Sequence, residues 1–223
     1  ASKNSPAVDS PCGGKNCYLS GLLLTPLEKP LSMFGADNET PCAVAQPRPA
    51  STVVLLRDTG AGLETLLLKR NKALMFAGGY WVFPGGALEP ADLAEARDDE
   101  LQASRIAAAR EAWEESGLRP RLEEMVLVSH WTTPVAEPKR FSTWIYAAPV
   151  ASAEDVVIDG GEIHDHLWIG IDDALARHGR GELAILPPTM ITLLSLSSYN
   201  SLAELVAEER SSAVPQVLPV FAI

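Results

Sequence analysis

The most constraining feature of this chain is a glutamate-rich run at residues 110–118, with the sequence REAWEESGL. If the run is helical, Glu111, Glu114 and Glu115 fall within about 100° of one another around the helix axis, so three carboxylates share one face. Gly117 follows as a residue that commonly ends a helix in the left-handed conformation. Three like charges this close repel one another, and a hard divalent cation with oxygen ligands is the usual relief. The run therefore predicts a helix that carries a metal site.

The whole helix is expected over about residues 99–116, and its pattern indicates which side it buries. Ile106, Ala109 and Trp113 fall opposite the glutamates and are predicted to face the core. The acidic residues at 98–100 stand where the helix begins, where its dipole favours negative charge. Small residues flank the acidic face and are expected to leave room above it: Ser104, Ala107 and Ala108.

A glycine-containing turn precedes the helix. It reads Phe-Pro-Gly-Gly at residues 83–86 and is followed by an acidic loop that contains Asp92. A glutamate-rich helix face alone is most often a solvated surface. Arg110, Gly117 and the two turn glycines add further fixed positions, and a motif of several parts favours metal binding over a solvated face.

Together these residues resemble the signature of the Nudix hydrolases: Gly, five residues, Glu, seven residues, then Arg-Glu-apolar-x-Glu-Glu-x-Gly-apolar. The second half matches at each fixed position of residues 110–118. In the first half, five residues separate Gly86 from Asp92, which stands in place of Glu, and seventeen residues rather than seven then precede Arg110. We therefore predict a ten-residue insertion, about residues 93–102, in a loop and the first helical turn.

Similar stretched signatures occur in the coenzyme A diphosphatase-like and peroxisomal-type Nudix branches, which also favour a Phe-Pro-Gly-Gly entry. The segments 66–70 and 138–141, together with Gly79, resemble flanking motifs of those branches. The resemblance extends over about residues 51–210. The chain departs from the coenzyme A motif at Met75, where that motif has Arg.

The resemblance implies an α/β protein with a Nudix-type α/β/α sandwich and a mixed sheet. It implies that Glu111, Glu114 and Glu115 bind Mg²⁺ or Mn²⁺, and that the backbone carbonyl of Gly86 completes the metal site. Water then attacks a phosphorus of a nucleoside diphosphate linked to another group. Metal ions of this kind offset charge on the diphosphate and lower the pKa of bound water. The resemblance thus implies that Glu114 and Glu115 are both metal ligands and catalytic residues.

The resemblance also suggests roles for residues outside the glutamate run. Arg110 is expected to order the motif by pairing with an acid, here Asp92. Glu162 follows a glycine-containing loop of the kind that supplies a general base or an extra metal ligand, and a plain solvent-exposed acid is the equal alternative. Arg70 and Arg140 stand at strand ends where a guanidinium can bind a substrate phosphate, although a surface salt bridge explains each of them almost as well.

Four further side chains have structural readings that we favour. Tyr80 and Trp81 could stack on a base, because every base offers a π-face, but core packing beside the turn is the more frequent outcome. His164 and His166 would share one face of a strand with Glu162. Without a fourth ligand or a strong spacing rule we do not assign them a zinc site.

The chain divides into an irregular extension (1–50), a hydrolase domain (51–210) and an extended tail (211–223). Helices are expected at 188–208 and, shorter, at 172–177. The 188–208 helix is amphipathic and covers the sheet or joins a homodimer; the sequence leaves both open. Strands are expected at Thr52–Leu56, Thr65–Leu68, Met125–Trp131, Thr143–Val150 and Leu167–Ile171.

Charge and composition narrow the partners. The chain carries 18 Lys and Arg against 29 Asp and Glu, a net charge of −11, which disfavours nonspecific binding to nucleic acid or to anionic membranes. An anionic small molecule, the nucleoside diphosphate derivative, would therefore need a metal ion. Without an apolar stretch long enough for a membrane span or a basic leader, we expect a cytoplasmic protein. Cys12, Cys17 and Cys42 match no common zinc spacing, and a Cys12–Cys17 disulfide stays open.

The sequence thus predicts a metal-dependent Nudix pyrophosphohydrolase. A coenzyme A-type substrate is the first choice and ADP-ribose or an ADP-sugar the second. The alternative is a non-catalytic nucleotide-sensing module that keeps the fold, although such a module has no need of three intact glutamates. A plain interaction protein would leave the spacing of turn and helix coincidental.

Overall fold

A computed structural model of the protein describes residues 44–60, 62–74, 77–151 and 155–219. The predicted N-terminal extension up to residue 43, with its three cysteines, lies outside the described residues. The same holds for Met75 and for the last four residues of the predicted tail.

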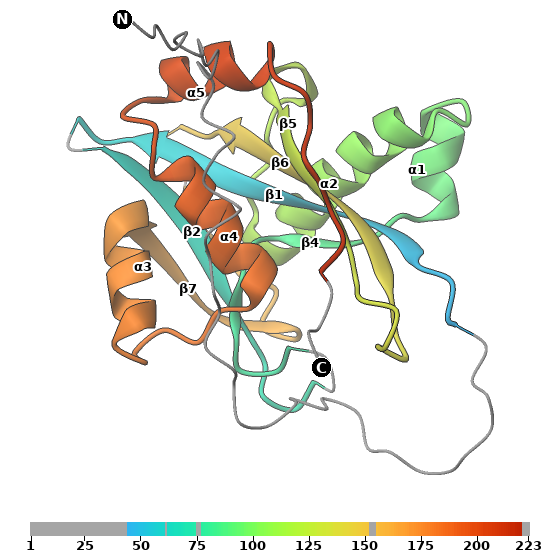
Figure 1. Cartoon of the computed structure of the whole chain (residues 1–223), viewed down its shortest axis with the longest axis horizontal. Helices are drawn as coiled ribbons and strands as arrows, with labels where there is room; N and C mark the ends of the chain where they lie inside the picture. The colour runs from blue at the N-terminus through green and yellow to red at the C-terminus, as the bar shows by residue number, and fades with distance from the viewer. Residues whose placement is uncertain (1–43, 61, 75–76, 152–154, 220–223) are drawn as a thin grey trace, which may run out of the picture. The chain divides into compact units, whose positions relative to one another are not determined.

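A mixed sheet forms the centre of the described part of the chain (Figure 1). Its strands are hydrogen-bonded in the order β3-β2-β1-β6-β5-β8, while β4 also pairs with β1 and β7 pairs with β2. β1 is parallel to β6, and it is antiparallel to β2 and β4. The strands are β1 (Arg48–Asp58), β2 (Leu63–Arg70), β3 (Trp81–Val82), β4 (Gly85–Ala87), β5 (Val126–Thr132), β6 (Phe141–Pro149), β7 (Ile163–Gly170) and β8 (Gln216–Val217). All five predicted strand segments lie on these strands or within one residue of them.

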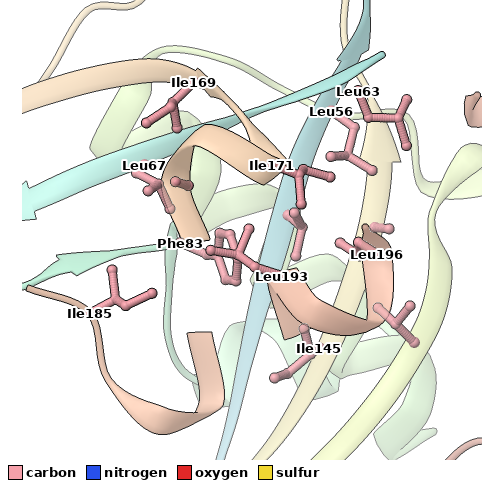
Figure 2. Close-up of a cluster of buried hydrophobic side chains, with 14 of the residues drawn as sticks. Leu56, Leu63, Leu67, Phe83, Ile145, Ile169, Ile171, Ile185, Leu193 and Leu196 are labelled. Atoms are coloured by element: carbon pink, nitrogen blue, oxygen red, sulfur yellow. The ribbon is translucent and has the colours of Figure 1, made fainter. Parts of the chain in front are cut away.

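Helices cover both faces of the sheet (Figure 1). α1 and α2 lie on one face, and the C-terminal helices lie on the other. Side chains alternate along β1 between the two faces: Val53 and Leu55 pack under α2, while Val54 and Leu56 belong to the opposite core. Figure 2 shows Leu56 in that opposite core, beside Leu63 and Leu196. The helices are α1 (Pro90–Glu95), α2 (Glu100–Ser116), the 3₁₀ turn η2 (Leu122–Glu124), α3 (Ile171–Gly179), α4 (Pro187–Leu196) and α5 (Leu202–Glu209). The predicted α/β/α sandwich is therefore confirmed.

The long helix predicted over residues 188–208 is wrong, because the structure has α4 and α5 there with a break between them. The break carries Ser197, Ser198 and Asn200, whose side chains bond to nearby backbone and side-chain groups. Ser201 then caps α5 by accepting the N–H of Glu204 at 3.2 Å. The hydrogen bonds of these polar side chains end α4 and start α5, although the apolar residues alone would continue as one helix.

The insertion at about residues 93–102 holds more structure than the predicted loop and helical turn. Its first residues belong to α1, and a tight turn follows in which Arg97 and Asp98 both have positive φ, 55° and 63°. Asp99 then caps α2 by accepting the N–H of Gln102 at 2.9 Å, as expected for acids at this helix start. α1 and this turn bring Asp92 against α2.

The predicted buried face of α2 is only partly correct. Ala109 is buried as predicted, but Trp113 is 55% exposed, and small residues fill the interface with the sheet instead: Ala103, Ser104, Ala107, Ala108 and Ala112. Small side chains let the helix approach β1 closely, whereas bulk at the interface would hold it away. Glu111 and Glu115 lie on this same side, so two of the glutamates face the sheet rather than open solvent. No helix in the described ranges is long and apolar enough to cross a membrane.

Candidate active site

The glycine turn and the end of α2 meet at the edge of β1. The N–H of Gly85 donates to Oε2 of Glu115 at 3.0 Å. A Cβ on Gly86 would overlap the carboxylate of Glu111, and a Cβ on Gly85 would come within 2.5 Å of the Ser51 carbonyl oxygen. Only glycine therefore fits at Gly85, where the obstacle is backbone, while a side chain at Gly86 would displace the carboxylate of Glu111. The turn backbone lies directly against two of the glutamates.

Burial makes both of these glutamates reluctant to ionise. It raises the pKa of Glu115 to about 8, with further contributions from the charges of Glu111 and Glu162, while the Gly85 N–H and Arg70 act in the opposite direction. Burial likewise raises the pKa of Glu111, and Arg110 opposes that rise. The site thus concentrates negative charge where water solvates it poorly.

Arg110 organises one side of the cluster. Its Nε and Nη2 donate to the two carboxylate oxygens of Asp92 at 3.2 and 3.1 Å, which is the predicted ion pair. Nη1 donates to Glu111 at 2.9 Å and to Glu114 at 3.1 Å. Burial alone would lower the pKa of Arg110, but Asp92 and Glu111 raise it above its ordinary value. Asp92 is 2% exposed and also accepts the N–H of Glu89, so the arginine ties α1 to α2.

Arg70 and Glu162 form the other side. Arg70 ends β2, and its Nη2 lies 2.9 Å from Oε2 of Glu162, while Nη1 lies 3.7 Å from Oε1 of Glu115. The structure therefore brings the predicted loop acid to the same cluster as the helix glutamates. Asp159, which the sequence interpretation passed over, fixes the loop by accepting the N–H groups of Glu162 at 2.8 Å and Ile163 at 2.9 Å. An Asp-Gly-Gly sequence is the signal for this kind of side-chain turn.

The donor set suits a hard divalent cation. Among the described residues, no group of three or more His, Cys, Asp or Glu side chains already has the arrangement of a metal site. The oxygens of Glu111 and Glu114 bond to Arg110, and Arg70 lies against Glu115. Carboxylates whose burial opposes ionisation gain most from a cation with oxygen ligands, so the residues present fit Mg²⁺ or Mn²⁺.

Comparison with known proteins decides the family. The sequence-family model that describes the NUDIX domain matches residues 46–187 of this chain. The chain belongs to the Nudix family. The recognition of a Nudix hydrolase from the glutamate motif is confirmed by this match. No curated protein is similar enough in sequence to count as a match.

Solved Nudix structures share the fold. A Nudix hydrolase from Alicyclobacillus acidocaldarius has a TM-score of 0.68 and 24% identity, over 74% of this chain and 97% of that chain. The Nudix domain of Shewanella oneidensis NrtR in complex with ADP ribose has a TM-score of 0.51 and 18% identity, over 78% and 95%. A MutT Nudix hydrolase from Burkholderia pseudomallei has a TM-score of 0.50 and 22% identity, over 67% and 98%.

The Nudix domain does not bring every predicted residue to the cluster. Arg140 is 7% exposed, and its hydrogen bonds run to the backbone carbonyls of Thr133 at 3.0 Å and Ala45 at 2.9 Å. These bonds connect the loop between β5 and β6 to the segment just before β1. Arg140 forms neither the surface salt bridge nor a contact with the glutamates. Its predicted role in substrate binding has no support in its hydrogen bonds.

The remaining candidates lie as follows. Trp81 is buried in the core beneath α3 and α4, with the Lys69 ammonium 5.2 Å from its ring centroid, so core packing is correct for it. Tyr80 is partly exposed. His164 and His166 are exposed on β7, and we assign them no zinc site.

Proposed function

We propose that this Nudix chain is a divalent-cation-dependent hydrolase that cleaves the diphosphate bond of a nucleoside diphosphate linked to another group. The observation that carries the proposal is the convergence of Glu111, Glu115 and Glu162, because burial of the two helix glutamates, with the charge of Glu162 added, raises the pKa of both. Arg110 and Arg70 offset part of this negative charge, but burial still opposes the ionisation of Glu111 and Glu115. A cation that binds there resolves the cost.

In this proposal Glu111, Glu114 and Glu115, with the carbonyl of Gly86, hold Mg²⁺ or Mn²⁺. The ion supplies charge neutralisation of the diphosphate and a lowered pKa of water. Glu162 accepts the proton of the attacking water, since it is an exposed carboxylate outside α2 whose charge acts on both Glu111 and Glu115.

Two arginines have different tasks. Arg110 keeps α1 and α2 in register through Asp92, so it is a positioning residue. Arg70 is largely buried and already lies between two carboxylates, and a bound cation would free its guanidinium for a substrate phosphate.

The choice of substrate rests on two observations other than the glutamate cluster. A coenzyme A-type substrate is supported by the Phe-Pro-Gly-Gly entry and the stretched signature. ADP-ribose or an ADP-sugar is supported by the Nudix domain that was solved with ADP ribose. Both are small-molecule nucleoside diphosphate derivatives, and the acidic chain disfavours nucleic-acid and membrane partners.

Purified protein incubated with a panel of diphosphates tests the proposal. The panel contains coenzyme A, ADP-ribose, an ADP-sugar and a dinucleoside polyphosphate, each with Mg²⁺, with Mn²⁺ and with excess chelator, and products are separated by chromatography. We expect metal-dependent release of a nucleoside monophosphate or a phosphorylated pantetheine from at least one substrate. Tight binding of a substrate without turnover would instead identify the nucleotide-sensing alternative.

A further inference from the structure

The loop that carries Glu162 is attached at its start to the end of α2. The N–H of Val157 donates to the carbonyl of Ser116, the last residue of α2, at 2.8 Å. Val156 and Ile158, on either side of Val157, pack against the core cluster beneath α2. A backbone hydrogen bond and two core contacts therefore hold the start of the loop against the helix that carries the proposed metal ligands.

Asp159 organises the next part of the loop around one carboxylate. Its Oδ2 accepts the N–H groups of Gly161 at 3.2 Å and Glu162 at 2.8 Å, and its Oδ1 accepts that of Ile163 at 2.9 Å. Burial acts to raise the pKa of Asp159, but these backbone hydrogen bonds outweigh it and lower the pKa below its ordinary value. Gly160 has a φ of 71°, which lets the chain turn tightly enough for one side chain to reach all three groups.

Asn71, the residue after β2, holds the same loop from the other side. Its backbone N–H donates to the carbonyl of Glu162 at 2.7 Å, and its side-chain amide donates to the carbonyl of Gly161 at 3.2 Å. The amide oxygen of Asn71 accepts the N–H of Ala73 at 3.1 Å, which sets the orientation of the side chain. The backbone N–H of Glu162 thus bonds to Asp159, and its carbonyl bonds to Asn71.

The residue after Glu162 and the Glu162 side chain are anchored as well. Ile163 is 0% exposed and lies opposite Arg70 at the point where the register between β2 and β7 shifts. Such irregularities occur beside active sites, where they direct a side chain. The carboxylate of Glu162 lies 2.9 Å from Nη2 of Arg70. Glu162 is therefore held by its backbone, by its neighbour and by its carboxylate before any ligand binds.

We propose that Asp159 and Asn71 are positioning residues for Glu162, which hold its carboxylate beside the proposed metal ligands so that the loop needs no closing movement. The inference rests on the proposed function, because it takes Glu162 as the group that accepts the proton of the attacking water. Proton transfer requires the base within hydrogen-bond reach of the water, and a misplacement of about 1 Å can cost about 100-fold in rate. A base that is fixed in advance avoids the cost of ordering it in each catalytic cycle.

The first measurement needs no activity. Amide hydrogen exchange is followed by NMR in the protein without metal or substrate, and the amides of Glu162 and Ile163 should exchange slowly although the loop is exposed. Asp159→Ala should speed their exchange by about 10-fold or more, because it removes their acceptor. Asp58→Ala is the matched control, since Asp58 accepts the N–H of Gly60 at 3.0 Å in the turn at the other end of β2, and it should leave both amides unchanged.

The second measurement is a double-mutant cycle in kcat. Rates are measured with saturating Mg²⁺ on whichever of coenzyme A and ADP-ribose the wild type hydrolyses. Asp159→Ala should lower kcat by about 5- to 50-fold with little change in KM, and Asn71→Ala should lower it less. Asp159→Asn keeps one oxygen acceptor and should recover part of the loss.

The cycle separates positioning from a merely structural role. In the Glu162→Gln background, Asp159→Ala should change kcat by less than about twofold, because the group that it positions is already gone. Binding of Mn²⁺ should stay at the wild-type level in Asp159→Ala and Asn71→Ala, and Asp58→Ala should keep both binding and kcat. If melting shows that Asp159→Ala does not fold, Asn71→Ala and Asp159→Asn carry the same cycle.

Each failure has its own meaning. If the wild type turns over a substrate, but the variants of Asp159 and Asn71 keep their kcat or lose as much in the Glu162→Gln background as alone, the positioning role is wrong and the proposed function stands. Rapid exchange of the Glu162 amide in the wild type, or a loss of Mn²⁺ binding that accompanies the loss of kcat, would also overturn the positioning role. If the wild type hydrolyses neither substrate, the proposed function fails and the positioning role fails with it.

Discussion

The backbone N–H of Gly85 donates to the carboxylate of Glu115 at 3.0 Å, and this bond joins the glycine turn to the last turn of α2. Glu115 is 7% exposed, so the bond supplies one of few partners to a carboxylate that water barely reaches. The two halves of the Nudix signature therefore meet at one point, despite the insertion between them. The insertion supplies the end of α1, the turn that follows it and the start of α2.

The glycine turn gives the first prediction. Gly86→Ala should lower the free energy of unfolding by about 1–3 kcal/mol, because its Cβ would overlap the carboxylate of Glu111. It should also weaken Mn²⁺ binding, measured by calorimetry. Gly179→Ala is the matched control, since no atom lies near a Cβ there and its φ is not positive. Its Mn²⁺ binding should stay at the wild-type level, and its unfolding free energy should not fall, because alanine favours the end of α3 over glycine. Equal behaviour of the two variants would contradict the close approach.

The second prediction concerns the pair of Arg110 and Asp92. Arg110→Lys keeps the charge but loses the bidentate contact, so we expect a loss of about 2 kcal/mol or more in unfolding free energy and weaker metal binding. Arg121→Lys changes a guanidinium that pairs with Glu123 on the surface, and its Tm should not move. Thermal melting with and without Mn²⁺ measures both effects. If Arg110→Lys keeps the wild-type Tm both with and without Mn²⁺, Arg110 is not a positioning residue.

The third prediction is a pH dependence away from the active site. Burial raises the pKa of Glu209, which accepts the hydroxyl of Tyr199 at 2.7 Å. A carboxyl with a raised pKa in the folded state binds its proton more tightly there than in the unfolded chain, so its contribution to stability falls as pH rises above the unfolded value. Glu209→Gln should therefore gain stability relative to the wild type between pH 4 and pH 7, in paired melts. A constant difference across that range would refute the shift.

The sequence predicted much of the site because its chemistry is local. The spacing of Glu111, Glu114 and Glu115 follows from the helical repeat alone, and the Arg110–Asp92 contact follows from matching the signature across the insertion. The buried face of α2 could not be obtained this way. Hydrophobicity favoured Trp113, while close packing selected alanines, and the distance between α2 and β1 decides between them only in three dimensions.

Residues far apart in the sequence were the hardest to place. Arg140 has the charge of a phosphate ligand, but its guanidinium bonds to the backbone carbonyls of Thr133 and Ala45. No sequence pattern predicts these two partners. The cytoplasmic location, the homodimer and the division into three segments stay predictions.

The fourth prediction separates Glu162 from its histidine neighbours. Glu162→Gln should lower kcat at least tenfold with little change in KM, since a group that accepts a proton in the transition state affects turnover more than binding. His164→Ala and His166→Ala should keep near-normal kcat, because both side chains are exposed on β7. Rates are compared at saturating metal and substrate. If Glu162→Gln keeps most of its kcat, the base must be sought among the glutamates of α2.

The central claim is that the α2 glutamates bind a divalent cation which the reaction requires. Electron paramagnetic resonance of Mn²⁺ tests it most directly, because free and bound Mn²⁺ give different signal intensities. The wild type should bind Mn²⁺, while Glu114→Gln and Glu115→Gln should bind it much more weakly, stay folded and lose kcat by orders of magnitude. Equal Mn²⁺ binding by all three proteins, or full diphosphate hydrolysis in excess chelator, would contradict the account.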